Sequence, residues 1–293
     1  MIPAPFHYHA PLTVAEALRL LKEHGAEAKL LAGGHSLLPL MKLRLAAPAH
    51  LIDLGRIPDL REIRREGEGV RIGAMATHWL IESSDLARER APLLPETAAQ
   101  IGDLQVRNVG TIGGSVAHAD PAADYPAAVL ALEATLRAEG PKGRRAIPAA
   151  EFFTGLYSTA LAAEEILVEI MVPAHPTVPG RGAAYLKFPH PASGFAVVGV
   201  AAVVQLDGEG RCERVRLGVN GVAPVPYRAQ GVEDRLTGQA PTPERLAEAA
   251  KAAAEGVDVN ADTFASAEYR THLATVFARR ALAEAVERAR SGR

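Results

Sequence analysis

Cysteine is almost absent from the sequence, and long apolar runs are absent too. The single cysteine, Cys212, excludes an internal disulfide and cannot supply the several thiolates that hold an iron–sulfur cluster. The longest apolar stretch, Phe195 to Leu206, is shorter than the roughly 20 residues needed to span a bilayer. The N-terminus lacks the basic and apolar segments of a secretory signal. These absences predict a cytoplasmic protein without a transmembrane segment, in which any iron–sulfur cluster lies on a partner.

An excess of charge of one sign is also lacking. The net charge is -2 and the arginines are interspersed with aspartate and glutamate, so the sequence predicts no nucleic-acid surface. The ten histidines show no metal-binding spacing, because His7 and His9 lie two apart and neither His-x-x-x-His nor Cys-x-x-Cys occurs. We therefore expect no metal site. Without Gly-x-Ser-x-Gly or a partnered nucleophilic cysteine, we also expect no catalytic residue in this chain.

Length and composition are those of a globular protein with two domains. The 293 residues, 48% of them hydrophobic and 23% charged, exceed the roughly 150 residues of one domain. Pro, His and Gly cluster without apolar periodicity from Pro173 to Gly182, which marks the expected boundary. We expect a first domain at residues 1–175, divided into parts of about 1–56 and 57–175, and a second domain at residues 176–293.

The opening segment has the pattern of an α/β unit. Thr13 and Glu16 form a capping box before a run of helical apolar spacing. The pair Gly33-Gly34 stands between an expected strand and an expected helix, which Ser36 can cap. The expected elements are a helix that ends at Gly25, a strand at Ala28 to Leu31, a helix from Ser36 to about Leu45, and a strand at Leu51 to Leu54.

A second glycine pair, Gly113-Gly114, also precedes an expected helix. Asp120-Pro121 supplies an N-cap and an N1 proline for a helix through Leu130, and Thr242 and Ser266 begin two later helices. Strands followed by helices predict an α+β second domain. The other expected elements are a hairpin over Arg61 to Met75, a helix over Pro92 to Ile101, and strands at Thr135-Leu136, Ile166 to Val172, Tyr185 to Phe188, Phe195 to Leu206 and Cys212 to Val219.

The two glycine pairs are the strongest candidates for a ligand site. A pyrophosphate needs backbone N–H groups at close range, and a side chain at those positions would hold the anion away. A following helix adds favourable electrostatics, and the hydroxyls of Ser36, Thr111 and Ser115 are possible donors. Either pair alone is better explained by a tight turn, and the two matched pairs together favour a ligand site. Neither has the Gly-x-Gly-x-x-Gly pattern of a Rossmann site or the Gly-Lys-Ser/Thr of a P-loop.

The residues around both pairs resemble a known family, the FAD-binding medium subunit of molybdenum hydroxylases of the carbon monoxide dehydrogenase and xanthine dehydrogenase group. The resemblance covers nearly the whole chain and implies an α+β protein: a bipartite, PCMH-type FAD-binding α/β domain followed by an α+β C-terminal domain. It rests on Ala32-Gly33-Gly34-His35-Ser36-Leu37-Leu38-Pro39, Met41-Lys42-Leu43-Arg44-Leu45, Leu51-Ile52-Asp53-Leu54, Arg107 to Ser115, Ala119 to Asp124, Glu164 to Leu167, Tyr185-Leu186-Lys187-Phe188 and Tyr269 to Leu273.

The resemblance also implies where FAD binds. Residues 32–36 and 111–115 would wrap the phosphates and the ribityl chain, and Asp124 would accept hydrogen bonds from the adenosine half. Lys187 would lie where a cation stabilises reduced flavin. The implied cofactor-binding set is Leu31, Ala32, Gly33, Gly34, His35, Ser36, Leu37, Ile101, Thr111, Ile112, Gly113, Gly114, Ser115, Asp124, Leu167 and Lys187. The sequence departs from relatives at Ser115, where many carry Asn, and at His190 to Phe195.

Each of these residues also has a structural interpretation. Asp120 and Asp124 lie one helical turn apart and could cap a helix instead of binding a ligand. Lys187 could be a surface lysine on a strand. His35 is expected to pack on the cofactor or cap the turn, without a catalytic role.

By resemblance, the chain carries electrons from two iron–sulfur clusters on a small subunit to FAD, while a large subunit holds the molybdenum cofactor. The assembly would be a dimer of heterotrimers. Met41-Lys42-Leu43-Arg44 favours the carbon monoxide dehydrogenase branch. Two alternatives stay open at this point: a stand-alone FAD-dependent oxidase or reductase of the same superfamily, and a flavin-free scaffold in which the glycine pairs are turns.

Overall fold

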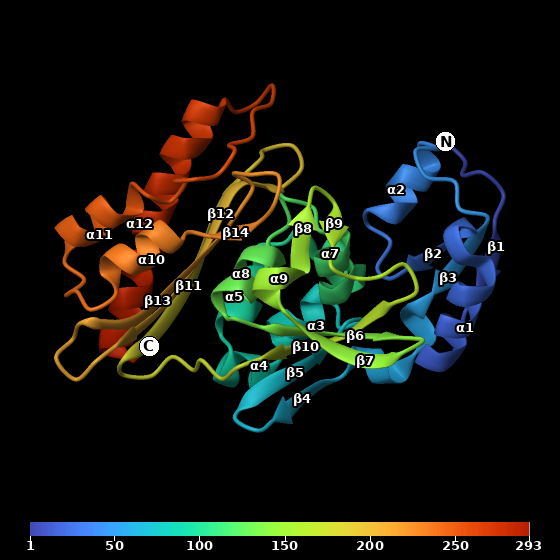
Figure 1. Cartoon of the computed structure of the whole chain (residues 1–293), viewed down its shortest axis with the longest axis horizontal. Helices are drawn as coiled ribbons and strands as arrows, with labels where there is room; N and C mark the ends of the chain where they lie inside the picture. The colour runs from blue at the N-terminus through green and yellow to red at the C-terminus, as the bar shows by residue number, and fades with distance from the viewer. Residues whose placement is uncertain (293) are drawn as a thin grey trace.

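The computed structural model describes residues 1–292. Three main sheets follow one another along the chain and along the long axis of the molecule (Figure 1). The N-terminal sheet lies at one end, the C-terminal sheet and its helices lie at the other, and the central sheet lies between them. None of the helices in residues 1–292 is long and apolar enough to cross a membrane.

The N-terminal unit is a small parallel sheet of order β1-β3-β2. Thr13 caps the first helix, since its hydroxyl accepts a hydrogen bond from the amide of Glu16, and Gly25 with φ +50° ends it. The Thr13 cap and the β-α-β order are confirmed, but the reciprocal half of the capping box is not, because the Glu16 carboxylate accepts from the amide of Leu12 and not from that of Thr13. Strand β1 was not predicted, because three residues give too short a pattern. The elements are β1 (His7–His9), α1 (Val14–His24), η1 (Gly25–Glu27), β2 (Ala28–Leu31), α2 (Leu37–Lys42), β3 (His50–Asp53), η2 (Leu54–Arg56) and η3 (Pro58–Arg61).

The central unit is an antiparallel sheet of order β4-β5-β10-β6-β7 with short helices around it. The predicted hairpin corresponds to β4 and β5, and the predicted strand at Ile166 to Val172 is β10. The elements are β4 (Ile63–Glu66), β5 (Gly69–Gly73), α3 (His78–Ser83), α4 (Asp85–Arg90), α5 (Leu93–Ala99), α6 (Leu104–Val109), α7 (Ile112–His118), α8 (Tyr125–Ala131), β6 (Thr135–Gly140), β7 (Gly143–Pro148), α9 (Ala149–Phe152), β8 (Phe153–Gly155), β9 (Ser158–Thr159) and β10 (Ile166–Val172).

The C-terminal unit is an antiparallel sheet of order β11-β12-β13-β14, against which the long helix α12 packs. Thr242 and Ser266 cap α11 and α12 through their hydroxyls, as predicted. The elements are β11 (Arg181–Pro189), β12 (Ala196–Leu206), β13 (Cys212–Asn220), β14 (Tyr227–Arg228), α10 (Gln230–Leu236), α11 (Pro243–Ala250) and α12 (Ala267–Ser291).

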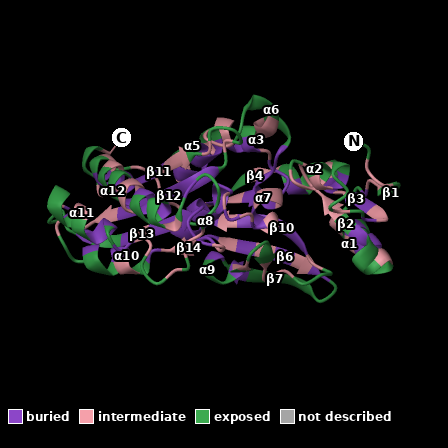
Figure 2. Cartoon of the chain, turned by 90° about the horizontal axis from the view of Figure 1, so that it is seen from above, coloured by how far each residue is buried: buried purple, intermediate pink, exposed green. Residues whose placement is uncertain are grey.

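The C-terminal sheet is buried on both faces (Figure 2). Ala202 and Val204 of β12 pack in the cluster formed with α10, α11 and α12. Ala201 and Val203, on the opposite face, belong to the core of the central unit. Gly218 of β13 lies so close to α8 that a Cβ there would overlap the carbonyl of Ala127. The second and third sheets therefore share one core.

One predicted helix start is wrong, and one predicted side-chain cap is not formed. Ser36 has helical φ and ψ of -100° and -49°, its side chain makes no capping hydrogen bond, and α2 ends at Lys42. An N-cap needs extended backbone for its side chain to reach the free amides. Asp120 instead forms a turn in which its carboxylate accepts from the amide of Ala122, 2.9 Å away. The helix begins at Tyr125, with Pro126 rather than Pro121 in its first turn.

Candidate functional site

The first glycine loop leaves its backbone amides free. It connects β2 to α2, and Gly34 has φ +74°, a conformation that side chains other than glycine rarely adopt. Within residues 1–292, the N–H groups of Gly33, Gly34, His35 and Ser36 donate no hydrogen bond to a protein acceptor. These consecutive donors, together with the uncommitted hydroxyl of Ser36, can bind the oxygens of an anionic group.

The two glycine loops lie against each other. A Cβ on Gly33 would lie 2.5 Å from the carbonyl oxygen of Val109 and 2.6 Å from the Cα of Gly110. A Cβ on Gly114 would lie 3.1 Å from the Cβ of Ala32. The structure therefore brings the two glycine pairs together, the first from the N-terminal unit and the second from the central unit.

The second glycine pair does not precede its helix as predicted: it lies in the first turn of α7, where its amides bond within the protein. Gly113 donates to the carbonyl of Ala74 at 2.8 Å, and Gly114 donates to the Thr111 hydroxyl at 3.1 Å. Ser115 donates to the carbonyl of Thr111 at 3.0 Å. A Cβ on Gly113 would overlap Ala74. The expectation that both pairs present free amides thus holds only for the first loop, and the second pair is required for close packing.

His78 supports the second loop from behind and was missed from the sequence. A Cβ on Gly110 would lie 2.5 Å from its Nε2, and the ring packs against Tyr125 with 5.4 Å between centroids. Burial lowers the pKa of His78 to about 3, with smaller contributions from His35 and Arg107. The imidazole is therefore neutral. The role of His78 is visible only through its contact with Gly110, and a single histidine in the sequence gives no indication of such a contact.

Asp124 and Lys187 form a buried ion pair. The Lys187 ammonium lies 3.0 Å from Asp124 Oδ1, and the two side chains are 4% and 5% exposed. Lys187 also donates to the carbonyls of Gln100 and Gly194 at 2.5 and 2.9 Å. The interpretation of Lys187 as a surface lysine is wrong, because β11 turns this residue inward.

Tyr185 completes this buried polar group and was also missed. The Tyr185 hydroxyl donates to Asp124 Oδ1 at 2.5 Å. Burial raises the pKa of Asp124, although Lys187 and Tyr185 both oppose the shift. A Cβ on Gly199 would lie 2.5 Å from the Tyr185 hydroxyl. Glycine at this position therefore makes room for the buried tyrosine.

The apolar residues of the predicted set pack in the core of the central unit. Leu167 on β10 and Ile112 at the start of α7 are buried there, and Ile101 is partly buried against the same cluster. Ile101 also follows Gln100, whose carbonyl accepts from Lys187. Leu31, Ala32 and Leu37 are partly buried beside the first loop, and His35 is exposed.

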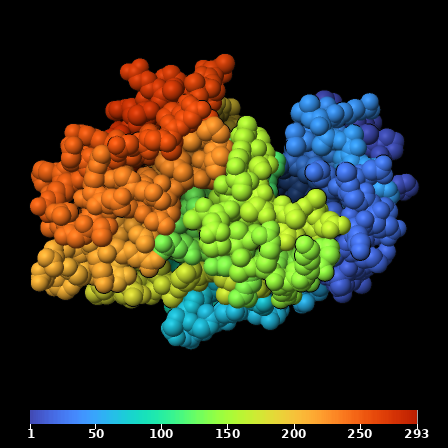
Figure 3. Space-filling model, viewed as in Figure 1, coloured from blue at the N-terminus to red at the C-terminus, as the bar shows by residue number. Residues whose placement is uncertain are grey.

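A recess separates the N-terminal and central units (Figure 3). Helix α2, which follows the first glycine loop, and helix α7, whose first turn contains the second glycine pair, stand on either side of it in Figure 1. The one cysteine in the chain is not a nucleophile, because burial raises the pKa of Cys212 to about 11. The site can thus hold an anionic ligand between two units, but it contributes no activated nucleophile.

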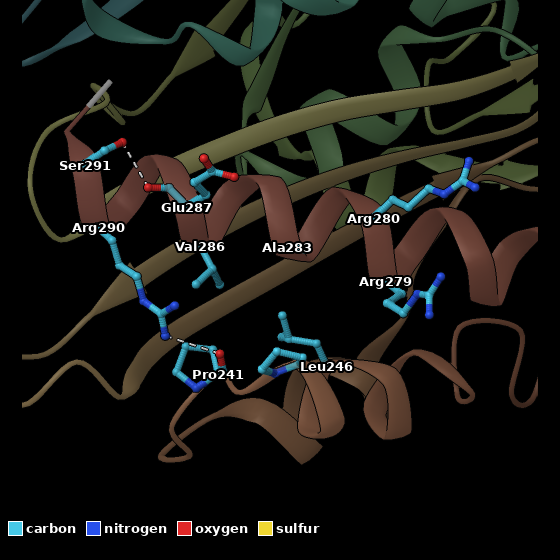
Figure 4. Close-up of a pocket in the computed structure, with 10 residues that line it drawn as sticks. Pro241, Leu246, Arg279, Arg280, Ala283, Val286, Glu287, Arg290 and Ser291 are labelled. Atoms are coloured by element: carbon cyan, nitrogen blue, oxygen red, sulfur yellow. Dashed lines mark hydrogen bonds between the residues drawn. The ribbon is translucent and has the colours of Figure 1, made fainter.

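A second hollow lies far from both glycine loops, between α11 and α12 (Figure 4). Its volume is about 820 Å³, and Leu246 and Val286 form part of its apolar floor. Arg290 crosses one end and donates to the carbonyl of Pro241 at 3.3 Å. The arginines at its rim show that it is chemically unlike the glycine site.

Comparison with known proteins identifies the family of this chain and its cofactor. The family described as "FAD binding domain in molybdopterin dehydrogenase" matches residues 4–175, and "CO dehydrogenase flavoprotein C-terminal domain" matches residues 183–285. The chain belongs to this flavoprotein family. It is accordingly an oxidoreductase subunit whose cofactor is FAD. The free amides and the absent Cβ atoms of the first loop fit the pyrophosphate of that cofactor.

Relatives of this flavoprotein family match the chain from end to end. The carbon monoxide dehydrogenase medium chain of Hydrogenophaga pseudoflava is 47% identical over 282 residues, which cover 96% of this chain and 97% of the relative. The nicotine 6-hydroxylase medium subunit of Paenarthrobacter nicotinovorans is 36% identical over 284 residues, covering 97% of this chain and 98% of the relative.

Solved structures show the same fold. The carbon monoxide dehydrogenase from Hydrogenophaga pseudoflava superposes with a TM-score of 0.95 at 48% identity, covering 98% of this chain and 99% of that chain. Quinoline 2-oxidoreductase from Pseudomonas putida 86 gives a TM-score of 0.92 at 32% identity, covering 99% and 100%. The predicted fold class, an FAD-binding domain followed by an α+β C-terminal domain, is confirmed.

Proposed function

We propose that this flavoprotein is the electron-transfer subunit of a carbon monoxide dehydrogenase-like hydroxylase, connecting iron–sulfur clusters on a partner with a terminal acceptor. The observation that carries the proposal is the 47% identity to a carbon monoxide dehydrogenase medium chain over nearly the full length of both chains. A stand-alone oxidase is less consistent with this match, because the relatives of this length are medium chains of larger enzymes.

The proposed cofactor-binding residues are those predicted from the sequence, with roles adjusted to the observed contacts. FAD, when bound, exchanges electrons singly or in pairs. The free amides of residues 33–36 would bind its phosphates, and Thr111 to Ser115 would support that loop and shape the recess. Asp124 and Lys187 would hold β11 and the segment ending at Ile101 in place, since their charged groups already satisfy each other.

The proposed partners are a large subunit with the molybdenum cofactor and a small subunit with [2Fe–2S] clusters. The single cysteine of this chain supports the assignment of the clusters to a partner, because a cluster needs several thiolates. A dimer of heterotrimers in the cytoplasm is the proposed assembly. We further propose domains at residues 1–175 and 176–293, with the first divided near residue 56, a division supported by the successive sheets.

The test compares the isolated chain with the complex. The chain is produced alone and together with large and small subunits from the same genome, and carbon monoxide-dependent reduction of an artificial acceptor dye is measured. We expect activity only in the complex, and loss of that activity together with FAD in Gly33→Ala but not in Gly208→Ala. Gly208 is a matched control because a Cβ there meets no atom within 4 Å. Turnover of a substrate by the isolated chain would overturn the proposal in favour of a stand-alone oxidase.

A further inference from the structure

Four histidines gather on one face of the N-terminal sheet, although their sequence spacing gave no sign of a metal site. His7 and His9 lie two apart on β1, so their side chains point to the same face. The parallel pairing of β1 with β3 sets His7 opposite His50, and His24 is the last residue of α1. Three elements separate in sequence thus bring these imidazoles together at the outer edge of the molecule (Figure 1).

The ring nitrogens of three of these histidines are already close together. His9 Nε2 lies 3.0 Å from His50 Nδ1, and the rings of His24 and His50 stack with 3.6 Å between centroids. One ligand nitrogen from each of His9, His24 and His50 lies within 4.8 Å of the others. Two imidazole ligands of a tetrahedral zinc ion lie about 3.4 Å apart, given a Zn–N distance of about 2.1 Å. Small side-chain rotations would therefore bring all three onto one ion.

Most lone pairs of the cluster accept no hydrogen bond. A neutral imidazole has one N–H and one lone pair, so three rings present three lone pairs. The contact between His9 and His50 uses one of them, and no other side chain or amide in residues 1–292 donates to these rings. Lone pairs that no hydrogen-bond donor uses are available to a metal ion.

A carboxylate near the cluster favours a cation there, since Glu23 Oε1 lies 4.0 Å from His24 Nε2. Packing alone would explain stacked rings. It would not explain why several ring nitrogens converge beside a carboxylate with most of their lone pairs unused.

We propose that His9, His24 and His50 bind one divalent cation of the class that prefers imidazole, with zinc as the physiological ion and water in the remaining positions. The near-parallel rings of His24 and His50, 9° apart, cannot both aim a lone pair at one point, so one ring turns on binding. The ion would tie β1, α1 and β3 together. It would thereby stabilise the sheet whose β2 leads directly into Gly33 and Gly34.

The experiment uses the full-length chain without a histidine tag, freed of metal by a chelator. Zinc is titrated in competition with a chromophoric chelator, and cobalt absorption reports the ligand set. The variants are His24→Gln and His9→Gln, with His272→Gln as the control because His272 is exposed on α12. We expect one equivalent of zinc in the wild type and the control. Loss of one ligand should weaken binding at least about tenfold, since even outer-shell changes cost that much.

Thermal unfolding with and without zinc gives a second readout that does not depend on activity. Zinc should raise the melting temperature of the wild type and of His272→Gln, and should leave that of His24→Gln unchanged. Equal FAD retention in all variants shows that they are folded. The proposal is overturned if the wild type binds less than one equivalent, or if His24→Gln and His9→Gln bind zinc as tightly as His272→Gln does.

Discussion

The ammonium group of Lys187 lies 3.0 Å from a carboxylate oxygen of Asp124, and both side chains are almost completely shielded from water. The pair joins β11 of the C-terminal sheet to the start of α8 in the central unit. Each charge therefore depends on the other for compensation across two sheets.

Removing one member of this pair should destabilise the protein strongly. We expect Lys187→Met to lower the free energy of unfolding by about 3–5 kcal/mol, because it leaves a buried carboxylate without its cation. The double variant Asp124→Asn/Lys187→Met should lose less than the sum of the two single variants. Urea unfolding of all four proteins measures this coupling. Additive losses would show that the two charges do not depend on each other.

The contact between the glycine loops predicts a specific loss of FAD. Gly33→Ala should remove most of the bound FAD, since the new methyl group would lie 2.5 Å from the carbonyl of Val109 and push the loops apart. Gly208→Ala adds the same methyl group in open space and should retain the cofactor. The measurement is the flavin absorbance that remains after desalting. Equal retention in both variants would contradict the proposed location of the phosphates.

The two serines expected to be helix caps should respond differently to substitution. Ser266→Ala should cost about 1 kcal/mol, because its hydroxyl accepts from the amide of Tyr269. Ser36→Ala should leave the stability of the FAD-free protein unchanged, because Ser36 makes no capping hydrogen bond. Thermal or urea unfolding without FAD distinguishes the two. A similar loss in both variants would mean that Ser36 caps α2 after all.

The buried His78 predicts a pH dependence of stability. Its folded pKa of about 3 lies below the unfolded value of about 6.5, so the unfolded chain binds the extra proton between these values. Stability should therefore fall as the pH falls below about 6.5, and this residue should account for about 2 kcal/mol between pH 7 and pH 5.

The matched variant for this effect is His78→Gln, which keeps a neutral polar side chain. Its unfolding free energy, measured by urea at pH 7 and pH 5, should change less with pH than that of the wild type. Identical changes in the two proteins would show that His78 takes up its proton in the folded state.

Local signals in the sequence predicted much of the fold. Thr13, Thr242 and Ser266 mark helix starts correctly because a cap depends only on residues within one turn. The strand at Ile166 to Val172 was recognised because a continuous apolar run needs no partner to be seen. The helix after Ser36 begins where the sequence predicts it, but Ser36 does not cap it, because its backbone is helical, a property set by the neighbouring loop rather than by its own residue type.

The candidate site was only partly predictable, because its contacts join distant residues. The glycine pairs were visible, but the use of the second pair's amides depends on Ala74, which lies on another segment. A surface position on a strand is one interpretation of Lys187 in the sequence, whereas in the fold its side chain is buried beside Asp124 and Tyr185. The spacing of the clustered histidines along the chain matches no metal-binding motif, because they lie on β1, α1 and β3, which are brought together only by the fold.

The side chains of β12 alternate between two apolar clusters, which couples the unfolding of the central and C-terminal sheets. Because Ala201 and Val203 complete the apolar cluster around α8, cutting the chain near residue 175 would expose that cluster to water. Neither half would then be expected to remain monomeric on its own. The central and C-terminal sheets should instead unfold in a single calorimetric transition. The two family models divide the chain between residues 175 and 183, but the parts on either side of that boundary should not unfold independently.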